Sequence, residues 1–185
     1  PHAAPGAPGV RSAGGRDGAQ PVCCAAVPDL KPTKIEVYAF RRRGRRVEFL
    51  CLKRARGRLA GVWQPATGSR EGGGGAHAGA AREFFEETGL RPRRWWALEG
   101  VGLYFDAPAG RARVMAMFAA EVRAGDRVKL SREHTDSAFL APAAAGRRLL
   151  WEAQRRGLES VRGEVLRGGA VARAPDVTRE MKDHS

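Results

Sequence analysis

Three glutamates, Glu83, Glu86 and Glu87, have a spacing that could create a metal site. Residues three and four apart lie on one face of a helix, so these carboxylates would project together. Clustered carboxylates repel one another and raise one another's pKa, so they do not stabilise a helix. Carboxylate oxygens are good ligands for Mg²⁺ or Mn²⁺. The spacing therefore indicates a divalent-cation site, in which Arg82 could orient a glutamate or neutralise charge.

The sequence predicts that a loop followed by a helix positions these glutamates. Residues 68–75 contain five glycines, which allow the backbone to approach an anion closely. The pattern predicts a helix over Ala76–Thr88, and Gly89 stands where a left-handed C-cap is required. Ala80 and Phe84 occupy the opposite helix face, where we expect them to pack against a sheet.

Alternating apolar residues predict strands on both sides of this helix. The predicted strands cover about residues 35–39, 47–52, 62–67, 95–105, 114–122 and 137–140. A further helix is expected from Pro142 to about Arg156, with a short helical continuation at 161–166.

The composition favours one folded domain between two irregular ends. The chain has 185 residues, and 43% are hydrophobic, which is enough for a core. Residues 1–32 are rich in Pro, Gly and Ala and lack periodicity, so we expect a disordered leader there. The domain is expected over 33–167 and a flexible tail over 168–185. The sequence has no apolar run of the roughly 18 residues that a membrane-spanning helix needs, so no membrane partner is expected.

The charge balance is strongly basic, with 33 Lys and Arg against 20 Asp and Glu, or a net +13. The leader is nearly balanced, so the domain itself carries about +12. This charge favours polyanionic partners such as nucleotides or nucleic acid, although a GC-rich coding sequence explains the arginine excess equally well. Three cysteines, two of them adjacent, do not form a disulfide framework and favour a reducing, cytoplasmic compartment.

The segment from Gly68 to Leu90 resembles the signature of the Nudix hydrolases. That signature is Gly, five residues, Glu, seven residues, Arg-Glu, an apolar residue, any residue, Glu-Glu, any residue, Gly and an apolar residue. Gly68 matches its first position, and 82–90 match its whole second half. Gly74 stands where the signature has its first glutamate, while Glu71 matches another acid common in that loop. The resemblance implies an active hydrolase with an α/β Nudix fold, an α/β/α sandwich around a mixed sheet.

Two shorter segments are similar to the bacterial dihydroneopterin triphosphate pyrophosphatases, also called dATP pyrophosphohydrolases. They are Trp63-Gln64-Pro65-Ala66-Thr67-Gly68-Ser69 and Ser131-Arg132-Glu133-His134. The similarity runs from about Lys31 to Leu158. Phe139-Leu140 replaces the Trp-Leu that usually follows the Glu-His pair.

Carried onto this sequence, the resemblance implies Mg²⁺ as cofactor, with Mn²⁺ as a substitute. The implied metal ligands are Glu83, Glu87 and Glu133. The implied catalytic residues are Glu83, Glu86 and Arg82, and the general base could be Glu83, Glu86 or Glu133. The implied substrate-binding residues are Arg54, Thr67, Lys31, Gly68 and Trp63.

Several of these residues also have simpler interpretations. Glu133 could be a solvated loop acid, and Arg54 could be a surface cation. Trp63 belongs either to the core or to a wall on which a base or pterin ring stacks. His134 could assist as a base, but we expect it to fix its loop through hydrogen bonds.

The sequence thus predicts hydrolysis of a nucleoside triphosphate-like compound, dihydroneopterin triphosphate or dATP, to a monophosphate and pyrophosphate. A dinucleoside polyphosphate or the triphosphate end of RNA are alternative substrates. Nucleotide binding without efficient turnover is a third interpretation, because Gly74 replaces a glutamate. The sequence determines neither the base nor the oligomeric state.

Overall fold

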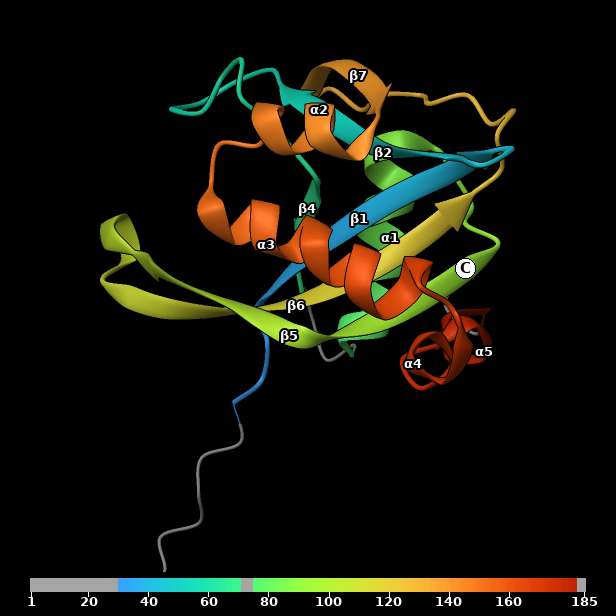
Figure 1. The fold of residues 1–185 in the computed structure, drawn as a ribbon. Helices are drawn as coiled ribbons and strands as arrows, with labels where there is room; N and C mark the ends of the chain where they lie inside the picture. Colours follow the sequence, from blue (N-terminus) through green and yellow to red (C-terminus); the bar gives the residue numbers. More distant parts are fainter. Residues whose placement is uncertain (1–29, 71–74, 183–185) are drawn as a thin grey trace, which may run out of the picture.

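The computed structural model describes residues 30–70 and 75–182. These residues form a mixed sheet with helices on both faces (Figure 1), which confirms the expected α/β/α fold. Its strands are β1 (Lys34–Arg43), β2 (Arg46–Arg54), β3 (Trp63–Gln64), β4 (Ala66–Ser69), β5 (Arg94–Asp106), β6 (Arg111–Val122) and β7 (His134–Leu140).

The centre of the sheet is β1, and its neighbours follow the order β3-β2-β1-β6-β5. The β1 strand is parallel to β6 and antiparallel to β2. Its first residues pair with β4, whereas its last residues pair with β2, so β4 enters the sheet beside β2. On its other side, β2 pairs with β7. This arrangement brings the ends of β4 and β7 to the site described below.

Helices cover the two faces of the sheet separately (Figure 1). The first face is covered by α1 (Ala76–Thr88), and the other by α2 (Pro142–Arg148), α3 (Glu152–Ser160) and the π-helical η2 (Val161–Leu166). The single helix expected from Pro142 to about Arg156 is therefore wrong. Leu149 adopts an extended conformation instead, because its side chain is buried and its backbone forms a bridge with Trp63.

Each face has its own core. On the α1 side, Ile35, Phe84 and Phe118 are almost completely buried, and on the α3 side Phe40, Phe49 and Trp96 are. The alternation of β1 explains this division, because successive side chains of a strand point to opposite faces. Small residues allow close approach of the layers: a Cβ at Gly79 of α1 would lie 2.5 Å from Ile35 Cδ1.

The segment after Gly168 differs from the expected flexible tail. It contains the short helices α4 (Gly169–Arg173) and α5 (Thr178–Lys182), and Met181 is buried in the α1-side core. The Val177 amide also donates to the Trp95 carbonyl at 3.0 Å. Met181 thus anchors this segment in the α1-side core, and backbone and side-chain bonds, such as that from Arg94 to Asp176 at 2.6 Å, attach it to β5. The expected leader lies outside the described residues except for its last positions.

The β5 and β6 strands are longer than expected and continue to the 3-10 turn η1 (Ala107–Ala109). Their hairpin projects beyond the rest of the sheet (Figure 1). None of the helices in the described ranges is long and apolar enough to cross a membrane.

Candidate active site

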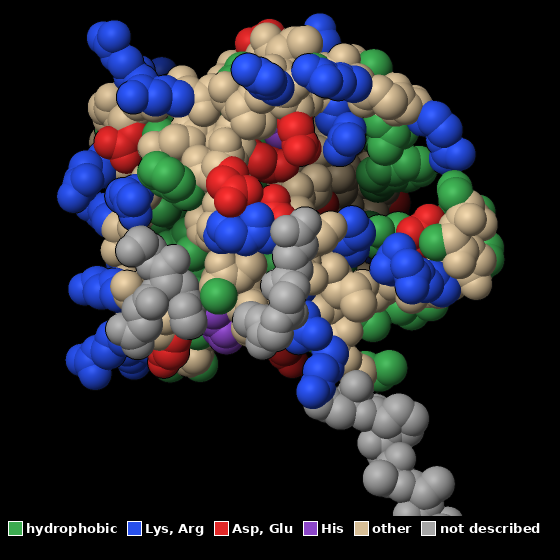
Figure 2. Space-filling model, turned by 180° about the vertical axis from the view of Figure 1, so that it is seen from behind, with side chains coloured by type: hydrophobic (Ala, Val, Ile, Leu, Met, Phe, Trp, Pro, Cys, Tyr) green, Lys and Arg blue, Asp and Glu red, His purple; other side chains and the backbone are tan. Residues whose placement is uncertain are grey.

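The α1 helix has the boundaries and the cap that its sequence predicts. Gly89 has φ 64°, and its N–H donates to the Phe85 carbonyl at 2.7 Å. Ala80 and Phe84 are buried against the sheet, as expected. The polar side of α1 is exposed at the centre of the face in Figure 2, where acidic side chains gather and basic side chains surround them.

The three glutamates of α1 do not share one environment. Glu87 is 4% exposed, whereas the side chains of Glu83 and Glu86 are 17% and 54% exposed. The three glutamates occupy adjoining positions of the helix, as their spacing predicts. The Glu87 side chain, however, is directed toward the sheet, where it accepts the Thr67 N–H. The cluster therefore runs from the interior to the solvent.

Arg82 connects two of these glutamates to the preceding strand. Its guanidinium donates to Glu83 at 2.8 Å, to Glu86 at 3.0 Å and to the Ser69 carbonyl at 3.2 Å. Glu83 also accepts the Ser69 N–H at 3.2 Å. Charge-assisted bonds of this kind fix side-chain geometry. Arg82 thus holds the end of β4 against α1.

Gly68 has a steric function at this junction. A Cβ at Gly68 would overlap the Glu83 side chain, so only glycine allows β4 to approach α1 this closely. The neighbouring Thr67 contributes its N–H to Glu87 at 3.3 Å, and its hydroxyl accepts from Gln64 at 3.0 Å. These contacts give Gly68 a structural role, whereas the sequence resemblance implied a role in substrate binding.

The loop before β7 brings Glu133 to the end of α1. Lys129 N–H donates to the Thr88 carbonyl at 2.7 Å, and Ser131 N–H donates to the Glu87 carbonyl at 3.2 Å. These bonds satisfy carbonyls that the last turn of a helix leaves unpaired. The Glu133 carbonyl in turn accepts the Ala55 N–H at 2.8 Å. Backbone bonds thus fix the loop, while the Glu133 residue itself is exposed.

Burial, together with the charges of Glu133 and Glu83, raises the pKa of Glu87 to about 8, although the Thr67 N–H and the Arg54 charge lower it. Glu87 is therefore close enough to both Glu83 and Glu133 to be repelled by their charges. The described residues contain no preformed group of three or more His, Cys, Asp or Glu arranged around a metal. The oxygen donors and their mutual repulsion nevertheless fit a hard divalent cation, which would favour their ionised forms. Glu71 and Gly74 lie outside the described residues.

Arg54 and His134 face each other across β2 and β7, beside this cluster. His134 is 6% exposed, and neither of its ring nitrogens has a hydrogen-bond partner among the described residues. The expected hydrogen bonding to its loop is therefore made by the backbone and not by the ring: the His134 N–H donates to the Ser131 carbonyl at 3.3 Å. Burial lowers the pKa of His134, and Glu133 opposes this change. Arg54 Nε is also buried without a partner in the described part of the chain.

Two other expected substrate contacts lie at the periphery. Trp63 is half-buried, with the Arg148 guanidinium 4.5 Å and the Lys53 ammonium 6.0 Å from its ring centroid. Lys31 is exposed and precedes β1. Lys34, which the sequence analysis missed, donates to Ser69 Oγ at 2.6 Å. Only the pairing of β1 with β4 reveals that contact, and the sequence does not specify this register.

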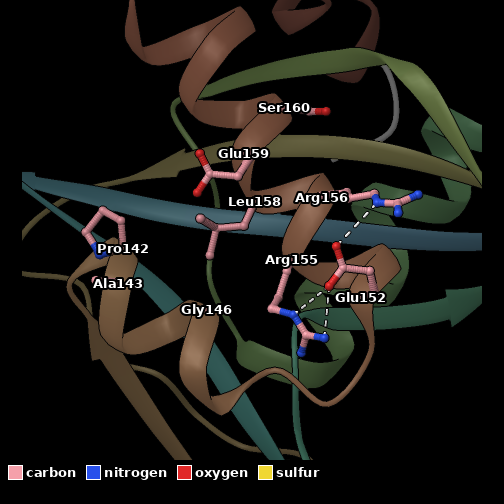
Figure 3. A pocket seen from close by; sticks show the side chains of 9 residues that line it. All are labelled: Pro142, Ala143, Gly146, Glu152, Arg155, Arg156, Leu158, Glu159 and Ser160. Carbon is pink, nitrogen blue, oxygen red and sulfur yellow. Dashed lines mark hydrogen bonds and ion pairs between the residues drawn. The ribbon is translucent and has the colours of Figure 1, made fainter.

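A separate cavity of 390 Å³ lies between α2 and α3 (Figure 3). Arg155 and Arg156 line it, but both form ion pairs with Glu152. The cavity belongs to the helical layer opposite α1 and lacks the clustered carboxylates. We therefore place the candidate active site at α1.

Comparisons with known proteins identify the class. Residues 32–161 match the family described as NUDIX domain. Similar solved structures include an Ap4A hydrolase from C. elegans, with 19% identity, TM-score 0.63 and coverage of 71% of this chain and 96% of that chain. The E. coli dihydroneopterin triphosphate pyrophosphohydrolase has 20% identity, TM-score 0.57 and coverages of 71% and 96%. The MutT protein from Methanosarcina mazei Go1 has 28% identity, TM-score 0.57 and coverages of 72% and 96%.

No curated protein matches the chain with significant similarity. The family match covers more than half of the sequence, so the chain belongs to the NUDIX domain family. Its enzyme class is that of a Nudix pyrophosphohydrolase.

Proposed function

We propose that this protein is a Mg²⁺-dependent pyrophosphohydrolase that cleaves a nucleoside triphosphate-like substrate to a monophosphate and pyrophosphate. The observation that carries the proposal is the buried Glu87, which is held beside the carboxylates of Glu83 and Glu133. A chain gains nothing structurally from such repulsion. A cation-dependent reaction at a phosphoanhydride explains why the three groups are kept together.

Glu83, Glu87 and Glu133 would hold Mg²⁺, and Mn²⁺ could replace it. When bound, the cation supplies charge neutralisation on the phosphate oxygens and a lower pKa for attacking water. Glu83, Glu86 or Glu133 would accept the proton of that water. Arg82 would keep Glu83 and Glu86 in position through the bonds described above.

The remaining proposed contacts concern the substrate. Arg54 has a buried Nε without a partner in the described residues and lies beside Glu87, which supports a contact with a phosphate. The Thr67 and Gly68 backbone would border the phosphates, and Lys31 would approach from the start of β1. Trp63 would provide a face for the base or pterin ring, where stacking contributes about 1–3 kcal/mol.

Dihydroneopterin triphosphate and dATP are the substrates we favour, because the segments around Trp63–Ser69 and Ser131–His134 resemble that group. The similar E. coli structure belongs to a dihydroneopterin triphosphate pyrophosphohydrolase. A dinucleoside polyphosphate is the alternative, since another similar structure is an Ap4A hydrolase. Arg148 and Lys53 beside Trp63 would suit extra phosphates. The basic surroundings in Figure 2 also suit an RNA 5′ triphosphate.

A substrate panel tests the proposal. Dihydroneopterin triphosphate, dATP, the other nucleotides, Ap4A and a short 5′-triphosphate RNA are incubated with Mg²⁺, and the phosphate products are identified. We expect pyrophosphate and a monophosphate from the preferred substrate, and no turnover by Glu87→Gln. Glu159→Gln, on the exposed side of α3 in an ion pair with Arg162, is the matched control and should retain turnover.

The panel also tests the weaker alternative that Gly74 motivates. If the wild-type chain binds these nucleotides but hydrolyses none of them at high Mg²⁺, the protein is a nucleotide-binding module. Hydrolysis that is equal in wild type and Glu87→Gln contradicts the proposed site.

A further inference from the structure

Lys34 places a positive charge on the α3 side of the sheet, where the proposed reaction does not use it. Side chains of a strand alternate between the two faces, so Lys34 shares its face with Tyr38, a member of the α3-side core. On that face α3 reaches as far as Glu36, to which its Gln154 donates at 3.3 Å. Lys34 lies beyond Glu36 and is half-buried. Figure 1 shows the beginning of β1 past the edge of α3.

The Lys34 ammonium has hydrogen-bond donors that the described residues leave unused. An ammonium carries three N–H groups, and that of Lys34 donates to Ser69 Oγ at 2.6 Å. No carboxylate in the described part of the chain forms an ion pair with it. Glu36, the next residue on the same face, already accepts from Tyr38 and Gln154. The ammonium is therefore bound to one neutral hydroxyl and lacks a counter-charge among the described residues.

The surroundings of Lys34 make an uncompensated charge unfavourable. The parallel pairing of β1 with β6 puts Met115 beside Lys34 on the same face. Met115 lies against Gly102, where an added Cβ would be 3.2 Å from the Met115 side chain. A half-buried ammonium next to an apolar side chain is poorly solvated, and charges in such places are normally paired. We therefore expect an anionic partner for Lys34.

Ser69 connects Lys34 to the candidate active site. The Ser69 hydroxyl accepts from Lys34, while the Ser69 N–H donates to Glu83 at 3.2 Å. The Ser69 carbonyl accepts from Arg82, also at 3.2 Å. A single residue of β4 thus contacts both the Lys34 ammonium and a proposed metal ligand. An anion bound by Lys34 would lie close to the proposed cation.

We propose that Lys34 and the Ser69 hydroxyl form a second phosphate subsite, which binds the polyphosphate chain of the substrate on the α3 side of β4. The inference rests on the proposed function, because a cation at Glu83 would hold another part of the same chain. A single anion neutralises one of these positive groups, whereas linked phosphates neutralise both. Among the described strands β4 pairs only with β1, so the phosphate chain can pass over its other edge.

Binding of inorganic tripolyphosphate in excess chelator tests the subsite without metal or turnover. This probe has the linked phosphates of the favoured substrates and no base. Calorimetry on the full chain should show saturable binding, and Lys34→Met should weaken it by at least about tenfold. Lys182→Met removes an exposed cation of α5 and is the matched control, which should bind like wild type. No saturable binding in wild type, or equal affinity in Lys34→Met, overturns the proposal.

Kinetics with Mg²⁺ separate phosphate binding from mere support of β4. Lys34→Met should raise KM for the preferred substrate by at least about tenfold and change kcat by less than about threefold, because the subsite holds substrate and transition state alike. Ser69→Ala leaves the ammonium in place and should raise KM less. If kcat falls while KM is unchanged, or if Ser69→Ala reproduces the effect of Lys34→Met, then Lys34 acts by fixing Ser69 and the proposal is overturned.

Lys34→Arg protects the test against a folding defect, and thermal denaturation shows which variants are folded. The arginine keeps the charge and should recover most of the tripolyphosphate affinity that Lys34→Met loses. A folded Lys34→Arg that binds no better than Lys34→Met contradicts a subsite based on charge. The two proposals fail separately. Absence of turnover by wild type affects the proposed function, whereas metal-free binding that does not depend on Lys34 affects only the subsite.

Discussion

Two buried glutamates lie on opposite sides of the sheet, and their surroundings differ. Glu87 is 4% exposed beneath α1, and Glu36 of β1 is 3% exposed beneath α3. Glu36 accepts the Tyr38 hydroxyl at 2.6 Å and the Gln154 amide at 3.3 Å. Glu87 accepts one backbone N–H and is repelled by two carboxylates. Both glutamates are buried, so burial does not distinguish them. Their neighbours do: Glu36 is a structural carboxyl, and Glu87 is a candidate metal ligand.

Each glutamate site also depends on a glycine. Gly68 leaves room for Glu83, and Gly157 of α3 leaves room for the Tyr38 hydroxyl, because a Cβ at either glycine would overlap that side chain. The same steric device therefore supports two polar sites. At Gly68 it positions a proposed metal ligand, whereas at Gly157 it positions a donor that satisfies Glu36. Matched substitutions on the two sides can separate catalysis from folding.

The largest contrast is expected in activity between Glu87→Gln and Glu36→Gln. Loss of a proposed metal ligand should lower kcat/KM by more than about 100-fold, which corresponds to roughly 3 kcal/mol of transition-state stabilisation. Glu36→Gln keeps a buried group of the same shape and should stay within about threefold of wild type. Steady-state kinetics on the preferred substrate, with Mg²⁺, measures both. Equal losses of kcat/KM in the two variants would mean that Glu87 is no more important for catalysis than Glu36.

The stability of the metal-free protein should depend on pH through Glu87. Folding raises the pKa of Glu87 from about 4.5 to about 8, so its contribution is fully present below about pH 4.5. That contribution should be lost as the pH rises through about 8. Burial also raises the pKa of Glu36, although the hydrogen bonds from Tyr38 and Gln154 lower it. The difference between wild type and Glu87→Gln therefore isolates Glu87.

Denaturation at pH 5 and pH 9 in the presence of a chelator measures this difference. Wild type should lose more stability between the two values than Glu87→Gln does, and added Mg²⁺ should reduce the loss. A larger loss in the variant would mean that Glu87 is not the titrating group.

Gly68→Ala and Gly157→Ala should both destabilise the fold by about 1–3 kcal/mol, because each adds a methyl to an occupied space. Only Gly68→Ala should also lower kcat, by at least about tenfold, since it displaces Glu83. Thermal denaturation and kinetics on the same samples test the pair. An unchanged kcat in folded Gly68→Ala would show that the position of Glu83 is unimportant.

The smallest effect is expected for Tyr38→Phe. It removes one donor to Glu36 and should cost about 1–2 kcal/mol of stability, while the activity should remain near that of wild type. Urea denaturation measures the loss. A pronounced fall in activity without a loss of stability would extend the functional site across the sheet.

The sequence predicted features that depend on neighbours along the chain. The α1 helix, its Gly89 cap and the adjoining positions of its glutamates follow from helical periodicity. The break at Leu149 was missed because it depends on pairing with Trp63, which is far away in the sequence. Met181 reaches the core for the same reason.

Local spacing predicted the glutamates of α1, and the family resemblance added Glu133, but neither indicated how the chain brings them together. The approach of Glu133 to Glu87 depends on backbone bonds from Lys129 and Ser131, which no motif specifies. The buried cluster around Glu36 was not anticipated, because its members lie on different elements and an alternating strand gives no sign of a buried carboxyl. The unpaired ring of His134 also became evident only from its surroundings.

The central claim is that Glu87 forms a divalent-cation site with Glu83 and Glu133. Binding of Mn²⁺, measured by electron paramagnetic resonance without substrate, tests it directly in wild type, Glu87→Gln and Glu36→Gln. The account predicts saturable binding in wild type, a loss of affinity of more than about tenfold in Glu87→Gln and wild-type affinity in Glu36→Gln. Wild-type Mn²⁺ affinity in Glu87→Gln would contradict it.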